Sequence, residues 1–192
     1  AKQHPMGSIP QKIGDMYNLS MDIERRNKEG IAPVLPVLAE LDAVTDKDQW
    51  SATLGKAMDY GLWAMYVDAD AMNSSMNILN EYQAGFALSE KSYYFDQDEH
   101  TTHIRAEYLK HIEKMFTLFG MDNAAEKAQT VLRLETRLAG AALSNVELRD
   151  PVANYNKMSI AELQVLVPQV DGAVYFEGLN IAPDSLSVGQ VR

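Results

Sequence analysis

The strongest pattern in this sequence is a helical one, and it lies between residues 98 and 142. Apolar residues recur there every three or four positions, which places them on one side of a helix. The first stripe consists of Ile104, Tyr108, Ile112, Met115, Phe116 and Phe119, and the second of Ala128, Val131, Leu132, Leu138, Ala139 and Ala142. Gly120 lies between the two stripes, where a glycine can end a helix. Two long helices with apolar faces must bury those faces against other elements, so the sequence predicts a mainly α fold.

Shorter helices are expected on either side of this pair. Apolar spacing predicts them over residues 13–28, 34–41, 50–58 and 160–166. Ser159 directly precedes the last of these helices and Glu162 lies in its first turn, an S-x-x-E pair typical of a capping box. Residues 1–10 contain two prolines and a glycine, which predict an irregular lead-in.

A small β-structure is expected in the middle of the chain. Two runs, Leu62–Val67 and Met76–Tyr82, flank a polar cluster and are expected to pair as a hairpin. The C-terminal tail shows no helical period and ends on an apolar–polar segment, residues 186–191, which predicts one strand without partners. We therefore expect a single mainly α, multi-helical domain over residues 1–192, with at most a small β-hairpin.

Charge and composition exclude several classes of function. The chain has 17 Lys and Arg against 27 Asp and Glu, which gives a formal net charge of −10. Nucleic acids and anionic membranes require clustered positive charge, so neither is an expected partner. The sequence contains no cysteine, which excludes disulfides, thiol catalysis and zinc–cysteine sites. No apolar run approaches the ~20 residues of a membrane span, and no signal-peptide pattern opens the sequence.

Three residues of the first long helix have a spacing that could suit a metal ion. His103, Glu107 and His111 follow one another at intervals of four residues, which places them on one side of the helix. The two histidines are then about 12 Å apart along the axis, too far to share one zinc ion without another element. A half-exposed polar face is therefore the favoured interpretation.

A second group, Asp68, Asp70 and Asn73, is spaced like the start of a calcium-binding loop. Asn73 occupies the position where such a loop needs glycine, and Leu79 the position where it needs a bidentate glutamate. These residues are therefore interpreted as a polar turn.

Glu135 lies in an unusual place for a carboxylate. Its neighbours Val131, Leu138 and Ala142 put it on the apolar side of its helix. A carboxylate there must be paired or have a raised pKa, because burial disfavours the charged form. A catalytic acid and a structural anchor, with Arg149 as its partner, are both open. The lack of a second acid nearby favours the anchor, and replacement of Glu135 by alanine is expected to destabilise the domain.

Common catalytic motifs are absent from the sequence. It contains no H-E-x-x-H, no glycine-rich phosphate loop, no G-x-S-x-G and no paired-carboxylate motif. Either the function is binding, or the chemistry lies elsewhere in a longer polypeptide.

Three segments, taken in order, resemble motifs of one enzyme family. Residues 73–95 contain NSS, YQAGFAL and KSYYF, similar to K-N-S … Q-x-G-L-G-L-P-x-R-D-Y-Y. Residues 131–139, VLRLETRLA, are similar to V-x-x-L-E-T-x-L-A, and residues 149–159, RDPVANYNKMS, to R-x-D-P … Y-N-K-M-S/T. These are motifs of the neprilysin and endothelin-converting-enzyme family of zinc metallopeptidases, which includes bacterial oligopeptidases. The lack of cysteine departs from the disulfide-bonded animal members and favours a bacterial origin.

The resemblance implies that the chain is part of that family's N-terminal, mostly helical domain. In the family this domain caps a second, catalytic domain that carries the zinc-binding H-E-x-x-H motif, and the two enclose a chamber that admits peptides and excludes folded proteins. No catalytic and no metal-binding residue is therefore assigned to this chain, and zinc would lie in the missing C-terminal domain. The resemblance implies structural roles for Gln83, Gly85, Tyr93, Tyr94, Glu135, Arg149, Asp150, Tyr155 and Asn156.

The leading interpretation is thus a non-catalytic cap and substrate-chamber domain of a zinc metalloendopeptidase that hydrolyses oligopeptides. The chain alone would be inactive, and its partners would be the catalytic domain and the oligopeptide substrate. The alternatives are a free-standing helical module that binds peptides or proteins, and a metal-dependent enzyme built on the histidine face. The resemblance also implies a location in the cell envelope, the periplasm or the cell exterior.

Overall fold

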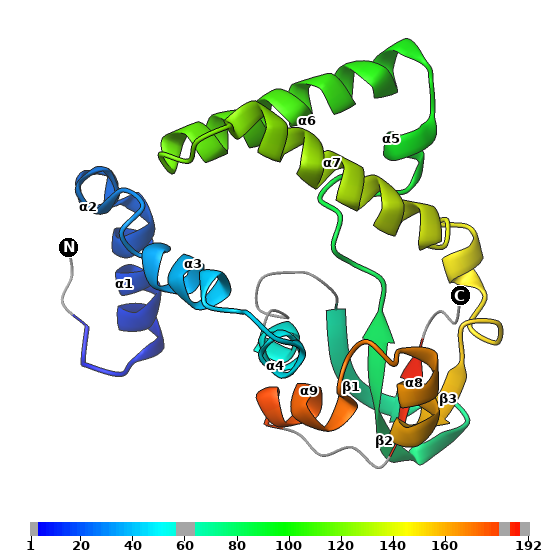
Figure 1. Ribbon diagram of the computed structural model, residues 1–192. Helices are drawn as coiled ribbons and strands as arrows, with labels where there is room; N and C mark the ends of the chain where they lie inside the picture. The colour runs from blue at the N-terminus through cyan, green and yellow to red at the C-terminus, as the bar shows by residue number, and fades with distance from the viewer. Residues whose placement is uncertain (1–3, 57–63, 181–184, 189–192) are drawn as a thin grey trace. The chain divides into compact units, whose positions relative to one another are not determined.

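The computed structural model describes residues 4–56, 64–180 and 185–188, the last by their backbone alone (Figure 1). The chain divides into two compact units, Ala1–Ala43 and Val44–Arg192, where the sequence predicts one domain. Four predicted features fall partly outside the described residues. They are the first three residues of the lead-in, the end of the helix predicted over residues 50–58, the start of the first hairpin run and the end of the tail strand.

The first unit consists of three helices, α1 (Ile9–Met21), α2 (Ile23–Glu29) and α3 (Leu35–Asp42). Helix α3 confirms the helix predicted over residues 34–41, whereas the single helix predicted over residues 13–28 is divided into α1 and α2. Asp22 separates α1 from α2, and its carboxylate accepts a hydrogen bond from the Arg25 amide at the start of α2 (2.9 Å). The irregular lead-in predicted over residues 1–10 is shorter than expected, because α1 begins at Ile9. Pro10 is compatible with this start, since the first helical turn does not use its missing N–H group.

The apolar side chains of the first unit are largely exposed. None of the side chains of α1, α2 and α3, all of which are described, is buried. Ile13, Met16 and Tyr17 lie close together on the surface of α1 and are between 64% and 70% exposed. The apolar face predicted for this helix is therefore not covered within the unit.

The second unit contains a four-stranded sheet. Its strands are β1 (Ala64–Asp70), β2 (Asn73–Tyr82), β3 (Asn156–Ser159) and β4 (Ser185–Val188), in the order β1-β2-β4-β3. Strands β1 and β2 form the predicted hairpin, in which Ala64 lies opposite Tyr82. The tail strand β4 has two partners where none was predicted, because it pairs parallel with β2 and antiparallel with β3. The partners come from segments far away in the sequence, and no local pattern of the tail indicates them.

Helices α4 (Lys47–Lys56), α8 (Ile160–Leu166) and α9 (Gly172–Gly178) belong to the same unit as the sheet. One cluster of buried core residues comes from α4, β2 and α9 and consists of Leu54, Leu79, Tyr175 and Phe176. Two glycines allow α4 and α9 to approach closely. A Cβ atom on Gly55 would lie 2.5 Å from the Tyr175 carbonyl oxygen, and one on Gly178 would lie 2.9 Å from that of Ala52.

Helix α9 corrects the expectation that the tail contains no helix. It has only seven residues, so it cannot repeat an apolar position often enough to reveal a helical period. A local signal marks its start, because the Asp171 carboxylate accepts a hydrogen bond from the Val174 amide (3.1 Å).

Two long helices and one short one form the remaining part of this unit. They are α5 (Ser92–Phe95), α6 (Glu99–Leu118) and α7 (Ala124–Ala141), of which α6 and α7 pack side by side (Figure 1). Of the two predicted apolar stripes, Ile112 of α6 and Ala128 and Ala139 of α7 are buried. Met115 and Leu138 of the same stripes are each 38% exposed. Gly120 has a φ of 68°, which a glycine adopts without strain at the end of a helix.

The mainly α class is confirmed, together with the hairpin. The capping box at the start of α8 is also confirmed, because the Glu162 amide donates to Ser159 Oγ (3.2 Å) and the Ser159 amide donates to Glu162 Oε2 (2.8 Å). Among the described residues, no helix combines the length and the apolar character that crossing a membrane requires.

Candidate functional site

The three motif segments are held in place by polar contacts, and the first group of contacts centres on Glu135. The Tyr94 hydroxyl donates to Glu135 Oε2 and the Tyr108 hydroxyl donates to Oε1, both at 2.8 Å. Tyr94 is only 4% exposed, and its oxygen also accepts a hydrogen bond from the Leu88 amide (3.0 Å). Helices α5, α6 and α7 each supply one member of this cluster, which therefore joins all three.

The cluster explains how a carboxylate can lie on the apolar side of α7. Burial, followed by the hydrogen bond to Glu135, raises the pKa of both Tyr94 and Tyr108, so both phenols remain protonated donors at neutral pH. Glu135 is paired, but its partners in the described chain are these two tyrosines rather than Arg149. Arg149 is exposed and ends the 3-10 turn η2 (Glu147–Arg149).

Gln83 fastens the first motif segment to the end of α7. Its side-chain amide pairs with the backbone of Leu143 in both directions, since Gln83 Nε2 donates to the Leu143 carbonyl (2.9 Å) and the Leu143 amide donates to Gln83 Oε1 (2.7 Å). Lys91 Nζ adds hydrogen bonds to the carbonyls of Gly140 and Ala142, both at 3.1 Å. The last carbonyls of a helix have no partner inside it, so these contacts cap α7.

Gly85 and Tyr93 serve this segment through their backbones. Gly85 has a φ of 83°, a backbone conformation in which a residue with a side chain would be strained. The Tyr93 carbonyl accepts a hydrogen bond from Arg105 Nη1 (2.7 Å), which ties α5 to α6. The Phe86 and Tyr94 rings meet edge to face with centroids 5.8 Å apart.

The third motif segment runs from a turn into the sheet. The Asp150 carboxylate accepts hydrogen bonds from the Val152 and Ala153 amides, both at 3.0 Å, which forms the turn. Strand β3 then begins at Asn156, opposite Val188 of β4. The predicted residues Asp150 and Asn156 are therefore in one segment, but the structure does not bring them to Glu135.

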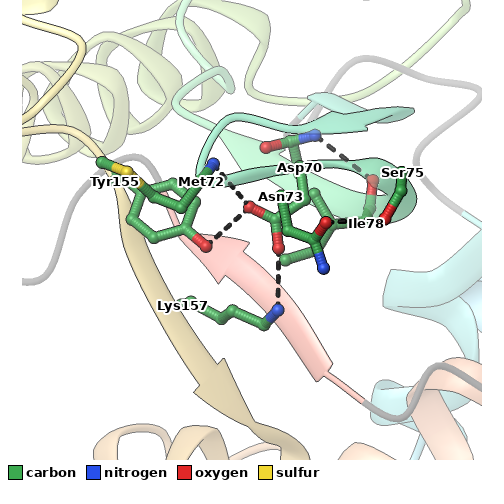
Figure 2. A network of polar contacts seen from close by, with 8 residues as sticks. Asp70, Met72, Asn73, Ser75, Ile78, Tyr155 and Lys157 are labelled. Carbon is green, nitrogen blue, oxygen red and sulfur yellow. Dashed lines mark hydrogen bonds and ion pairs between the residues drawn. The ribbon is translucent and has the colours of Figure 1, made fainter.

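Two residues of the third segment meet a buried carboxylate at the end of β1 (Figure 2). Asp70, which is 1% exposed, accepts hydrogen bonds at Oδ1 from the Tyr155 hydroxyl (2.7 Å) and the Met72 amide (2.9 Å). Lys157 Nζ donates to Asp70 Oδ2 at 2.7 Å. The hydrogen bond from Lys157, followed by the one from Tyr155, lowers the pKa of Asp70 to about 2. Asp70 is therefore ionised at neutral pH and holds the hairpin turn to β3.

Asp70 is the residue of this network that sequence reasoning misses. The sequence places it in a polar turn, whereas β1 and β2 continue through most of that cluster and leave only Ala71 and Met72 between them. A signal for its role does exist in the third motif segment. Tyr155 and Lys157 are two residues apart in an extended stretch, so their donors lie on the same side and require an acceptor there.

The described part of the chain contains no group of three His, Asp or Glu residues that could hold a metal ion. Glu107, which lies between His103 and His111 on α6, instead pairs with Lys110 at 2.6 Å. The polar contacts described above join elements of the chain to one another. They are suited to fixing the shape of the unit.

Several known proteins are similar to this chain. The sequence profile of Peptidase family M13 matches residues 1–192. Endothelin-converting enzyme-like 1 of Mus musculus is 29% identical over 182 residues, which cover 86% of this chain and 24% of that protein. Endothelin-converting enzyme 1 of Rattus norvegicus is 30% identical over 112 residues, which cover 57% of this chain and 15% of that protein.

Solved structures show the same similarity. The zinc metalloprotease Zmp1 of Mycobacterium tuberculosis, in complex with an inhibitor, matches with a TM-score of 0.85 and 31% identity, over 97% of this chain and 30% of that chain. PepO of Lactobacillus rhamnosis shares the fold, with a TM-score of 0.76 and 21% identity, over 95% of this chain and 30% of that chain. This chain spans less than a third of each of these four proteins.

Proposed function

We propose a function for this chain on the premise that it belongs to peptidase family M13, whose profile matches residues 1–192. The function is that of a non-catalytic cap, which forms part of the wall of a substrate chamber in a zinc metalloendopeptidase. The substrates of the longer protein are oligopeptides. The observation that carries this proposal is the match of 97% of the chain to 30% of a zinc metalloprotease, at 31% identity.

Zinc does not fit the described residues of this chain. They contain no group of metal ligands, and the sequence contains no H-E-x-x-H motif. We therefore assign zinc and the residues that use it to a catalytic domain in the longer protein, and that domain is the main partner of this chain. The 192-residue chain is then inactive by itself. The family resemblance supports a location of the longer protein in the cell envelope, the periplasm or the cell exterior.

The hydrogen bonds made by Gln83, Glu135 and Asp70, which we call the polar anchors, support the role of a chamber wall. A wall that selects substrates by size needs loops that keep their shape while peptides pass. Gln83, Glu135 and Asp70 each take part in two or more hydrogen bonds to residues far away in the sequence or on another element. The net charge of −10 would favour neutral or basic peptides over acidic ones.

The test uses the longer protein that contains this chain, with a short fluorogenic peptide and a stably folded protein as substrates. We expect cleavage of the peptide alone, loss of activity with a chelator and recovery with zinc. The variant Gln83→Ala should cleave the folded protein faster, relative to the short peptide, than the unmodified enzyme does, because it loosens the wall. Gln129→Ala, on the exposed surface of α7, is the matched control and should leave that ratio unchanged.

Two outcomes would contradict the proposal. One is cleavage of folded and short substrates at similar rates by the unmodified protein. The other is peptide binding without hydrolysis in the presence of zinc, which would favour the alternative of a helical peptide-binding module.

A further inference from the structure

Strand β1 is an edge of the sheet. In the order β1-β2-β4-β3 it has β2 on one side, and no other described strand pairs with it (Figure 1). An edge strand directs the N–H and C=O groups of alternate residues outward, where they can pair with another extended chain. The seven residues AMYVDAD include neither proline nor lysine, which proteins use to block such edges. The register shift at Ala69 and Asp70 affects only the last part of the strand.

The side chains beside this edge give it a chemical character. Met65 packs against the core, so Tyr66 and Asp68 lie on the opposite face of the strand. Tyr82 lies on that same face, because its partner in the ladder is Ala64, two residues before Tyr66. Tyr66 is 51% exposed and Tyr82 is 41% exposed, and Asp68 is exposed as well. The face next to the edge therefore presents two aromatic rings followed by a carboxylate.

We propose that β1 binds an extended peptide by strand addition. The peptide pairs its backbone with the outer edge of β1, places an apolar or aromatic side chain beside Tyr66, and places a basic side chain beside Asp68. Side chains of a strand alternate between faces, so these two peptide residues are two positions apart. The proposal rests on the proposed function only in naming an oligopeptide substrate as the source of the peptide.

Charge favours a basic peptide over the other candidates for this edge. The chain has a net charge of −10, so a second copy would bring another strongly acidic surface against Asp68. A peptide with arginine or lysine is attracted to the same surface. The edge would then collect substrate on the cap rather than at the zinc.

The backbone part of the proposal is tested with labelled peptides and the 192-residue chain, with binding followed by fluorescence anisotropy. One version of a basic peptide carries N-methyl groups on its odd residues and a second version on its even residues. Since the N–H groups of alternate residues point to the same side of an extended peptide, each version is blocked along one edge only. We expect one version to lose at least about tenfold in affinity and the other to bind like the unmodified peptide. Equal binding of both versions, or no binding of the unmodified peptide, would overturn the proposal. Dimerisation that competes with the peptide would also overturn it, because the edge would then serve a second copy.

The side-chain part is tested with two variants that change the net charge equally. Asp68→Lys should weaken the binding of a peptide with arginine at the basic position by about tenfold. It should strengthen the binding of the same peptide with glutamate at that position. Glu113→Lys, on the exposed surface of α6, should change neither preference. Equal effects of the two variants would show attraction by net charge alone and would refute a site at Asp68. Hydrolysis of oligopeptides by the longer protein is measured separately. The proposed function can therefore be confirmed even if the binding of a peptide to β1 is refuted.

Discussion

Replacement of Glu135 by alanine tests whether the tyrosine–carboxylate cluster holds α5, α6 and α7 together. The carboxylate accepts hydrogen bonds from Tyr94 and Tyr108, both at 2.8 Å, and Tyr94 is almost fully buried. A hydrogen bond to a charged group contributes ~1.5–3 kcal/mol, and the truncation leaves both phenols without this acceptor. Because Glu135 is only half-buried, water can replace part of the loss. We expect the free energy of unfolding to fall by about 2–4 kcal/mol.

This loss is large enough to measure by thermal and urea unfolding followed by circular dichroism. For a chain of this size 1 kcal/mol corresponds to a Tm change of ~2–4 °C, so the variant should melt about 5–15 °C lower. Glu113→Ala removes an exposed carboxylate from the neighbouring helix α6 and should change stability by less than about 0.5 kcal/mol. It is the matched control.

A double-mutant cycle shows whether the loss arises from the cluster. Tyr94→Phe should cost less stability in the Glu135→Ala background than in the unmodified chain, with a coupling of at least ~1 kcal/mol. The reasoning is refuted if Glu135→Ala costs no more than Glu113→Ala, or if Tyr94→Phe costs the same in both backgrounds.

Other contacts allow equally specific tests. Gln83→Ala removes both hydrogen bonds to Leu143 and should lower the free energy of unfolding by ~1–3 kcal/mol and accelerate hydrogen exchange of the Leu143 amide; unchanged exchange would contradict the clamp. Gly55→Ala places a Cβ 2.5 Å from the Tyr175 carbonyl oxygen and should lower the free energy of unfolding by ~1–3 kcal/mol. Gly14 has open space around it, so Gly14→Ala should raise the free energy of unfolding by ~0.5–1 kcal/mol. Changes in Tm of the same sign for the two variants would refute the packing argument. Asp70 has a pKa of about 2 against an ordinary 3.8, so its contribution to stability is complete above about pH 4 and is lost as the pH falls towards 2. The stability difference between the unmodified chain and Asp70→Asn, measured by urea unfolding, should shrink over that range, and a constant difference would contradict the assignment.

Long helices could be predicted from the sequence because their period repeats several times. The stripes on α6 and α7 each contain six apolar residues, and this number separates a helical period from chance. Strands β3 and β4 have four residues each, and their stability depends on pairing between segments far apart in the chain. No local pattern contains that information, so the sequence predicts the hairpin and the tail strand but neither β3 nor the partners of the tail strand.

The sequence shows that Glu135 needs a partner, but it does not show which residues pair with it. The apolar neighbours of Glu135 show that it needs a partner, and a search by opposite charge leads to Arg149. The partners are neutral phenols. A carboxylate can accept a hydrogen bond from a neutral hydroxyl as well as from a positively charged group, so charge alone does not identify its partner. Asp70 was missed for a related reason. Its spacing suggests a turn, and only the fold brings Tyr155 and Lys157 to it.

Peptide-bond cleavage by the purified 192-residue chain is the measurement that bears most directly on its role as a cap without chemistry of its own. The chain is incubated with zinc and a mixture of oligopeptides, and the products are identified by mass spectrometry beside those of the longer protein. We predict no product from the chain and cleavage by the longer protein. Cleavage that follows the chain through a final size-exclusion column, and is therefore not due to a contaminating protease, would contradict the account.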